Sequence, residues 1–94
     1  MATRLETSQI DTLLPTLGGW TYEDGGLTRA FKFSGFSEAF GFMTRVALAA
    51  QKADHHPDWS NSYDTVTITL STHDAGGVTD KDVALAKEIG KIVG

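Results

Sequence analysis

Three histidines are the residues of this sequence best suited to chemistry. His55 and His56 are adjacent, and His73 lies further along the chain. Histidine is the side chain that most readily takes up and releases protons near neutral pH. Each of these histidines follows a segment predicted to be regular, and loops held on a rigid scaffold commonly carry function. We therefore expect the three imidazoles to line one pocket from two sides and to perform acid–base chemistry.

The same histidines could instead bind zinc, or they could be surface or helix-capping residues without a chemical role. Adjacent residues in an extended segment point in opposite directions, so His55 and His56 are poorly placed to bind one ion. The sequence has no cysteine and none of the HxH, HxxxH or HExxH spacings. We therefore expect acid–base chemistry with no metal and no other cofactor.

Other kinds of site have weaker support in the sequence. Gly76-Gly77 lacks the GxxxxGK[ST] pattern of a phosphate-binding loop, so we interpret it as a turn. No serine lies in a G-x-S-x-G elbow, and no cysteine is present to act as a nucleophile. The net charge is -4, and the charges of both signs are interspersed without a basic stripe. This pattern argues against direct binding to nucleic acid.

The element that must position the histidine pair is a long helix over residues 37–53. Apolar residues recur there at helical spacing, and Ser37 is the expected N-cap. Pro57 stops the helix because the residue before a proline is pushed out of the α region. This places His55 and His56 at a junction between a helix and a strand. The stripe expected to face the core consists of Phe36, Phe40, Met43 and Ala47, with Phe42, Val46 and Ala49 beside it.

Strand-like segments lie on both sides of this helix. Residues 20–23 and 27–33 alternate apolar and polar side chains around an Asp-Gly-Gly hairpin turn. Residues 59–63 are expected to form a short strand, and residues 65–71 form the clearest strand in the sequence. The side chains of this last strand that should face the core are Val66, Ile68 and Leu70.

A short helix is expected at the N-terminal end, over residues 7–17. Thr7 or Ser8 could cap its start, since both side chains can accept a hydrogen bond from a backbone amide. Pro15 indicates that this helix ends or kinks near Leu14.

A last helix begins after Thr79, which is the expected N-cap, with Asp82 in the place of a capping-box acid. The predicted order is therefore helix, strand, strand, helix, strand, strand, helix. Because the strands come in pairs, this order indicates an α+β fold with an antiparallel sheet and helices on one face.

The length and composition limit the remaining possibilities. The 94 residues predict one domain, which spans residues 1–94. A chain of this size buries roughly 60–65% of its unfolded surface, so oligomerisation would be a natural supplement. No apolar run approaches the ~20 residues needed to cross a membrane. The first residues lack the apolar region of a signal peptide, and we therefore expect a cytoplasmic protein without membrane contact.

One combination of residues is specific enough to point to a known family. It consists of Lys52-Ala53-Asp54-His55-His56-Pro57-Asp58-Trp59, Tyr63, Leu70-Ser71-Thr72-His73-Asp74, Gly77 and Asp82, together with the run from Phe40 to Leu48. At this spacing, and from about Trp20 to the C-terminus, the sequence resembles the pterin-4a-carbinolamine dehydratase family.

The resemblance implies a four-stranded antiparallel sheet with three helices on one face, in the order α-β-β-α-β-β-α. It also implies a hydro-lyase, a 4a-hydroxytetrahydrobiopterin dehydratase. Such an enzyme converts 4a-hydroxytetrahydropterin to quinonoid dihydropterin and water, in the recycling of tetrahydrobiopterin-type cofactors used by aromatic amino-acid hydroxylases. A homodimer or homotetramer is implied as well. Some animal members of the family also bind a homeodomain transcription factor as a dimerisation cofactor.

The resemblance also assigns roles to residues. The three active-site histidines of the family fall on His55, His56 and His73. Our hypothesis is that His55 and His73 form the acid–base pair, while His56 binds or orients the substrate. The residues expected to contribute to substrate binding are Gln51, Pro57, Trp59 and Asp82.

The sequence departs from the family at Gln51, where a glutamate is often found. A glutamine can still hydrogen-bond to a pterin amide or ring nitrogen, but it cannot carry charge or relay a proton. The alternative function is a non-catalytic interaction module, similar to a transcriptional dimerisation cofactor, that uses an exposed apolar face of the helix at 37–53. A third option is a pterin-binding protein that acts on a related compound.

Overall fold

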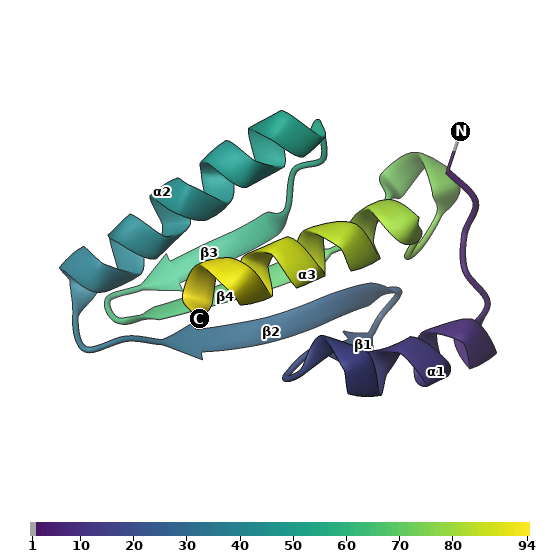
Figure 1. The fold of residues 1–94 in the computed structure, drawn as a ribbon, viewed down its shortest axis with the longest axis horizontal. Coiled ribbons are helices and arrows are strands. Elements are labelled where there is room, and N and C mark those ends of the chain that lie inside the picture. Colours follow the sequence, from purple (N-terminus) through teal and green to yellow (C-terminus); the bar gives the residue numbers. More distant parts are fainter. Residues whose placement is uncertain (1) are drawn as a thin grey trace.

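A computed structural model describes residues 2–94 (Figure 1). Its elements are α1 (Thr7–Leu17), β1 (Thr21–Glu23), β2 (Gly26–Lys32), α2 (Phe36–Ala53), β3 (Asp58–Ser62), β4 (Thr65–Leu70), the 3-10 turn η1 (His73–Ala75) and α3 (Asp80–Val93). The α+β fold class and the predicted order of helices and strands are confirmed.

The four strands form one antiparallel sheet in the order β1-β2-β4-β3. In Figure 1, α3 crosses in front of the sheet, with α1 and α2 on either side of it. The central strand β4 alternates as predicted, because its apolar side chains are buried while its threonines are half-buried. The buried residues of β4 are Val66, Ile68 and Leu70. This alternation fixes the register of β4, since a slip by one residue would turn the threonines into the core.

The hairpin between β1 and β2 is also confirmed. Asp24 and Gly25 have φ values of 48° and 79°, the left-handed conformation that tight two-residue hairpin turns require. Glu23 then pairs with Gly26 across the turn.

The buried face of α2 differs from the prediction. The side chains that face the core are Ala39, Phe42, Val46 and Ala50. By contrast, Phe36 and Phe40 are 49% and 55% exposed and Ala47 is also exposed, so the centre of the predicted stripe is wrong. Phe42 and Val46, which were predicted to lie beside it, are buried. The physical reason is that α2 carries apolar residues on more than one side. Helical periodicity is then satisfied by either set, and only packing against the sheet and α3 selects the buried one.

The N-terminus of α2 also differs from the prediction. Gly35 occupies the N-cap position in place of Ser37, and the helix begins one residue earlier than expected. The carboxylate of Glu38 accepts hydrogen bonds from the backbone N–H and the hydroxyl of Ser34, at 2.9 and 3.2 Å. The Glu38 side chain in the first turn thus holds Ser34, which lies just before the helix.

The helix α1 corrects two further predictions. Glu6 is its N-cap and forms a capping box with Gln9, so neither Thr7 nor Ser8 is the cap. The helix continues through Pro15 and ends at Leu17. Proline removes one hydrogen bond, to the carbonyl four residues earlier. Pro15 and Asp11 are both exposed, so water can reach the carbonyl that loses its partner.

The start of α3 follows the prediction closely. Thr79 is its N-cap, and Thr79 and Asp82 form the expected capping box. The buried side chains of α3 include Leu85, Ala86 and Ile89. No helix within residues 2–94 is long and apolar enough to span a membrane.

Candidate active site

The histidine pair lies directly after the C-terminus of α2. Asp54 ends this helix in the left-handed conformation, with φ 51° and ψ 44°. The backbone N–H groups of Asp54 and His55 then donate to the carbonyls of Gln51 and Ala50, each at 3.1 Å. These bonds hold the chain reversal in place, so the backbone at His55 is fixed to the last turn of α2.

The third histidine begins the 3-10 turn η1, just beyond β4. The backbones of Thr72 and Gly77 form a bridge, with hydrogen bonds of 2.9 and 3.3 Å in the two directions. Gly76 has a φ of 75°, which lets the chain turn back inside this bridge. His73 is therefore carried on a short closed loop at the end of the central strand.

These two segments enclose a pocket of about 310 Å³. Its lining residues are Asp54, His55, His56, Ser71, Thr72, His73, Asp74 and Lys81. All three histidines thus line the pocket from two separate segments of the chain, and its lining side chains are polar or charged throughout. The structure brings the three histidines together as expected from the sequence, while their individual roles stay predictions.

The environments of the three histidines are unequal. The side chain of His55 is only 10% exposed, whereas that of His73 is 78% exposed. Nε2 of His73 lies 3.1 Å from the Asp58 carboxylate, which is itself 67% exposed. Nε2 of His56, an exposed residue, lies 3.1 Å from Oε1 of Gln51. Each histidine therefore has one ring nitrogen bound to a protein oxygen.

Behind His55 lies a buried polar cluster that begins at Asp82. The Asp82 side chain is 0% exposed, and its Oδ1 lies 2.5 Å from Nε2 of His55. Its Oδ2 accepts hydrogen bonds from the Thr72 hydroxyl and from the Thr79 backbone N–H, both at 2.9 Å. The two threonine hydroxyls are 2.7 Å apart. The start of α3 is thus connected to His55 through groups that are removed from water.

None of the four residues expected to bind the substrate is among the residues that line this pocket. Gln51 contacts His56, and Asp82 contacts His55 from behind. Trp59 is half-buried on β3 and packs against the hydrophobic core. Pro57 is half-buried between the histidine pair and β3. Within residues 2–94, Gln51 and Asp82 therefore contact a histidine of the pocket without lining the pocket themselves.

Three of the lining residues, Ser71, Thr72 and Lys81, were not predicted as site residues from the sequence. Ser71 and Thr72 directly precede His73, and this adjacency is a signal that could have identified them. Lys81 comes from the first turn of α3, and only the packing of α3 beside the α2 terminus brings it to the pocket. Lys81 adds a cation to a lining that also contains the carboxylates of Asp54 and Asp74.

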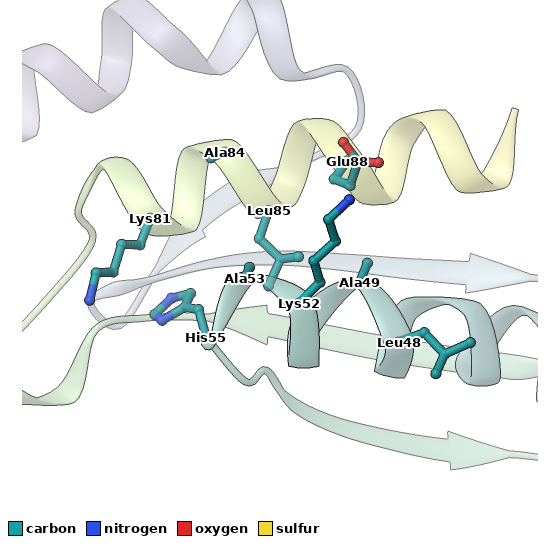
Figure 2. A pocket seen from close by; sticks show the side chains of 9 residues that line it. All are labelled: Leu48, Ala49, Lys52, Ala53, His55, Lys81, Ala84, Leu85 and Glu88. Atoms are coloured by element: carbon teal, nitrogen blue, oxygen red, sulfur yellow. The ribbon is translucent and has the colours of Figure 1, made fainter.

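A larger groove of about 600 Å³ runs between α2 and α3 and adjoins the pocket (Figure 2). His55 and Lys81 line both hollows and lie at one end of the groove, while Leu48 lies at the other end. Leu85 points into the groove between them. His55 therefore separates a polar pocket from a mainly apolar groove.

Residues 3–92 match the family model described as Pterin 4 alpha carbinolamine dehydratase. A provisionally named pterin-4-alpha-carbinolamine dehydratase from Rhodospirillum rubrum is 58% identical, over 100% of both chains. The chain therefore belongs to the pterin-4-alpha-carbinolamine dehydratase family, a family of hydro-lyases.

Two solved structures are also similar to this fold. The crystal structure of a transcriptional coactivator/pterin dehydratase from Brucella melitensis has a TM-score of 0.94 and 46% identity, and covers 98% of this chain and 100% of that chain. A pterin dehydratase-like protein described as a RuBisCO assembly factor in the alpha-carboxysome has a TM-score of 0.66 and 20% identity, over 80% of this chain and 87% of that chain. At that identity, the second likeness concerns the fold alone.

Proposed function

We propose that this protein dehydrates 4a-hydroxytetrahydropterin to quinonoid dihydropterin and water by histidine general acid–base catalysis. The observation that carries the proposal is the convergence of His55, His56 and His73 on one polar pocket. Membership of the dehydratase family supports the same reaction.

The reaction needs two proton transfers, one to the hydroxyl on C4a and one from the ring nitrogen bonded to C4a. The C4a–O bond breaks as an acid protonates the departing hydroxyl, which leaves as water. A base removes a proton from a ring nitrogen, and the electron pair released there forms the new carbon–nitrogen double bond. Positioned general acids and bases typically contribute about 10²–10⁴-fold to such steps.

The arrangement of the pocket fits a division of these tasks between His55 and His73. The two imidazoles come from separate segments of the chain and both line the pocket, so a flat ring bound there could exchange protons with both. His56 shares a wall with His55 and is held by Gln51, which suits a role in binding or orienting the substrate. Lys81 and the lining carboxylates offer further polar contacts to the substrate.

The test is stopped-flow dehydration of freshly generated 4a-hydroxytetrahydropterin. We expect the wild-type protein to accelerate the reaction, and His55→Ala and His73→Ala each to lose about 10²–10⁴-fold in kcat. Lys87→Ala, an exposed change on α3, is the matched control and should keep the wild-type rate. Unchanged turnover in both histidine variants would defeat the assignment of roles. No acceleration by folded wild-type protein would favour the non-catalytic interaction module instead.

The resemblance to the family, rather than the geometry of the pocket, supports the finer biological setting. We propose a place in the recycling of tetrahydrobiopterin-type cofactors and a cytoplasmic location. An assay with tetrahydrobiopterin-derived and simpler pterin substrates, compared by kcat/KM, would show whether the natural side chain matters.

A second proposal concerns association through α2, which carries exposed apolar side chains on its outer side. Phe36, Phe40 and Leu48 are 49%, 55% and 68% exposed, and the two phenylalanine rings lie 5.7 Å apart. Clustered exposed apolar residues commonly mark an interaction surface. We propose that this surface holds a homodimer or homotetramer together.

Analytical ultracentrifugation of wild type, Phe40→Glu and Lys87→Glu tests this association. We expect the wild type to sediment as an oligomer and Phe40→Glu to shift toward the monomer, because the variant places a charge in the apolar contact. Lys87→Glu makes an exposed change of charge on α3 and should leave the sedimentation unchanged. A monomeric wild type would leave the same surface to a different protein partner and would overturn the homo-oligomer proposal.

A further inference from the structure

The hydrogen bonds of the buried cluster behind His55 determine which of its groups donate and which accept. A backbone N–H can only donate, so Oδ2 of Asp82 must accept the hydrogen bond from the Thr79 amide. The hydroxyl oxygen of Thr79 accepts from the backbone N–H of Lys81 at 3.2 Å. The hydroxyl hydrogen of Thr79 is therefore free to point at Thr72.

The remaining hydrogens of the cluster then have one consistent direction. Thr79 donates to the Thr72 hydroxyl over 2.7 Å, and Thr72 donates its own hydrogen to Oδ2 of Asp82 over 2.9 Å. Both hydroxyls thus act as donors along a chain that ends on the carboxylate. Because Thr79 and Asp82 are 0% exposed and Thr72 is 4% exposed, water is not available to reverse this order.

With Oδ2 occupied by two donors, Oδ1 of the Asp82 carboxylate faces Nε2 of His55. Nε2 must then carry a hydrogen, whether the imidazole is neutral or charged. We propose that the cluster of Asp82, Thr72 and Thr79 holds His55 with Nε2 protonated. Nδ1 is then the atom that exchanges the proton with the substrate. The assignment of Nδ1 to catalysis rests on the proposed dehydratase function, whereas the assignment of the tautomer does not.

This inference gives Asp82 and Thr79 a positioning role, because both act through His55. Neither residue lines the pocket, and both are fully buried. A histidine whose second nitrogen is bound to a carboxylate keeps one tautomer and one ring orientation. The same T-x-x-D capping box that begins α3 therefore also sets the chemistry of a residue that follows α2.

Asp82→Asn is the sharpest variant, since it keeps the shape of the side chain. The Thr79 amide still needs an oxygen acceptor, so the asparagine must place its NH₂ group toward His55. Nε2 then has to accept a hydrogen bond, and the hydrogen of the neutral ring moves to Nδ1. We expect this reversal to remove the basic nitrogen from the pocket and lower kcat by about 10²–10⁴-fold, the size of a general acid–base contribution.

The experiment is ¹⁵N NMR of the imidazole nitrogens at mildly alkaline pH, with His55→Gln used to assign the His55 signals. We expect Nε2–H in wild type and Nδ1–H in Asp82→Asn. Nδ1–H in the wild type, or Nε2–H retained in Asp82→Asn, would overturn the inference. The wild-type spectrum is decisive by itself if the variant does not fold.

The same spectra separate this inference from the proposed function. An inactive wild type with the expected tautomers would overturn the dehydratase assignment and leave the positioning role of Asp82 in place. An active wild type in which His55 carries its hydrogen on Nδ1 would support the dehydratase assignment and overturn the positioning role of Asp82.

Thr79 provides a second test of the positioning role. Thr79→Val removes the hydroxyl at nearly constant volume, and Thr79→Ser restores it. We expect Thr79→Val to lower kcat by roughly tenfold with little change in KM, and Thr79→Ser to recover most of the loss, because only the hydroxyl supports the donor chain. An equal loss of kcat in both variants, with an unchanged His55 spectrum, would show that the hydroxyl of Thr79 does not act on His55 and would overturn its positioning role, because serine keeps both the hydroxyl and the helix cap.

Discussion

The site contains two pairs of histidine and aspartate that are alike in chemistry and different in environment. In the His55–Asp82 pair the two side chains are 10% and 0% exposed, whereas in the His73–Asp58 pair they are 78% and 67% exposed. The first pair is backed by buried hydroxyls and a backbone amide, while the second lies in water. We infer from this difference that the buried pair fixes the orientation of the His55 ring, whereas the exposed pair leaves the His73 ring free to adjust to the substrate.

The energetics of the two pairs should differ in the same way. An exposed ion pair contributes only about 0.2–1 kcal/mol, because water screens the charges and the side chains lose freedom. A buried carboxylate that satisfies several donors is different, since each donor left without a partner costs about 1–3 kcal/mol. The two aspartates can therefore be compared directly by substitution.

The largest expected effect is on stability. Asp82→Ala should lower the free energy of unfolding by about 3–5 kcal/mol, because it leaves buried donors on Thr72 and Thr79 without an acceptor. Asp58→Ala should change it by no more than about 0.5 kcal/mol, as expected for an exposed position. Urea unfolding followed by circular dichroism measures both values. Equal losses in the two variants would show that burial does not distinguish the pairs.

The next effect is on catalysis. Asp82→Asn should lower kcat by about 10²–10⁴-fold, because it reverses the tautomer of His55 and removes the basic nitrogen from the pocket. Asp58→Asn should lower it by less than about fivefold, because the exposed contact to His73 contributes little. Stopped-flow dehydration by the two variants makes the comparison. A larger loss of kcat in Asp58→Asn than in Asp82→Asn would show that catalysis depends on a fixed His73 and not on a fixed His55.

The smallest effect concerns His56, whose contact to Gln51 is exposed, like the contact between His73 and Asp58. Gln51→Glu restores the side chain that the family often carries and makes the 3.1 Å hydrogen bond charge-assisted. Charge-assisted hydrogen bonds are about twice as strong as neutral ones. We expect kcat/KM to rise by a few-fold, measured beside Gln51→Ala. A fall in Gln51→Glu would mean that this chain is adapted to an uncharged side chain at position 51.

Much of the fold follows from local patterns in the sequence. The alternation of Val66, Ile68 and Leu70 with threonines specifies a strand and its buried face. The Asp24-Gly25 turn and the Thr79 capping box likewise depend on neighbouring residues alone. The buried face of α2 could not be predicted, because its apolar residues occupy more than one side and packing makes the choice.

The sequence likewise predicted the histidines of the site but not the contact that holds His55. The histidines stand out because their chemistry is visible in the sequence. The contact between His55 and Asp82 joins residues 27 positions apart, and no local periodicity links them. The capping box identified Asp82 as a helix-start residue, but its second role depends on how α3 packs beside the end of α2.

The central claim is that His55 and His73 act together on one dehydration reaction, and a double-mutant cycle tests it most directly. The kcat of dehydration is measured for wild type, His55→Ala, His73→Ala and the double variant. Groups that act as a unit lose far less together than the product of their separate losses. We therefore predict that the double variant is within about threefold of the slower single variant. Losses that multiply would show that the two histidines act independently and would contradict the shared acid–base mechanism.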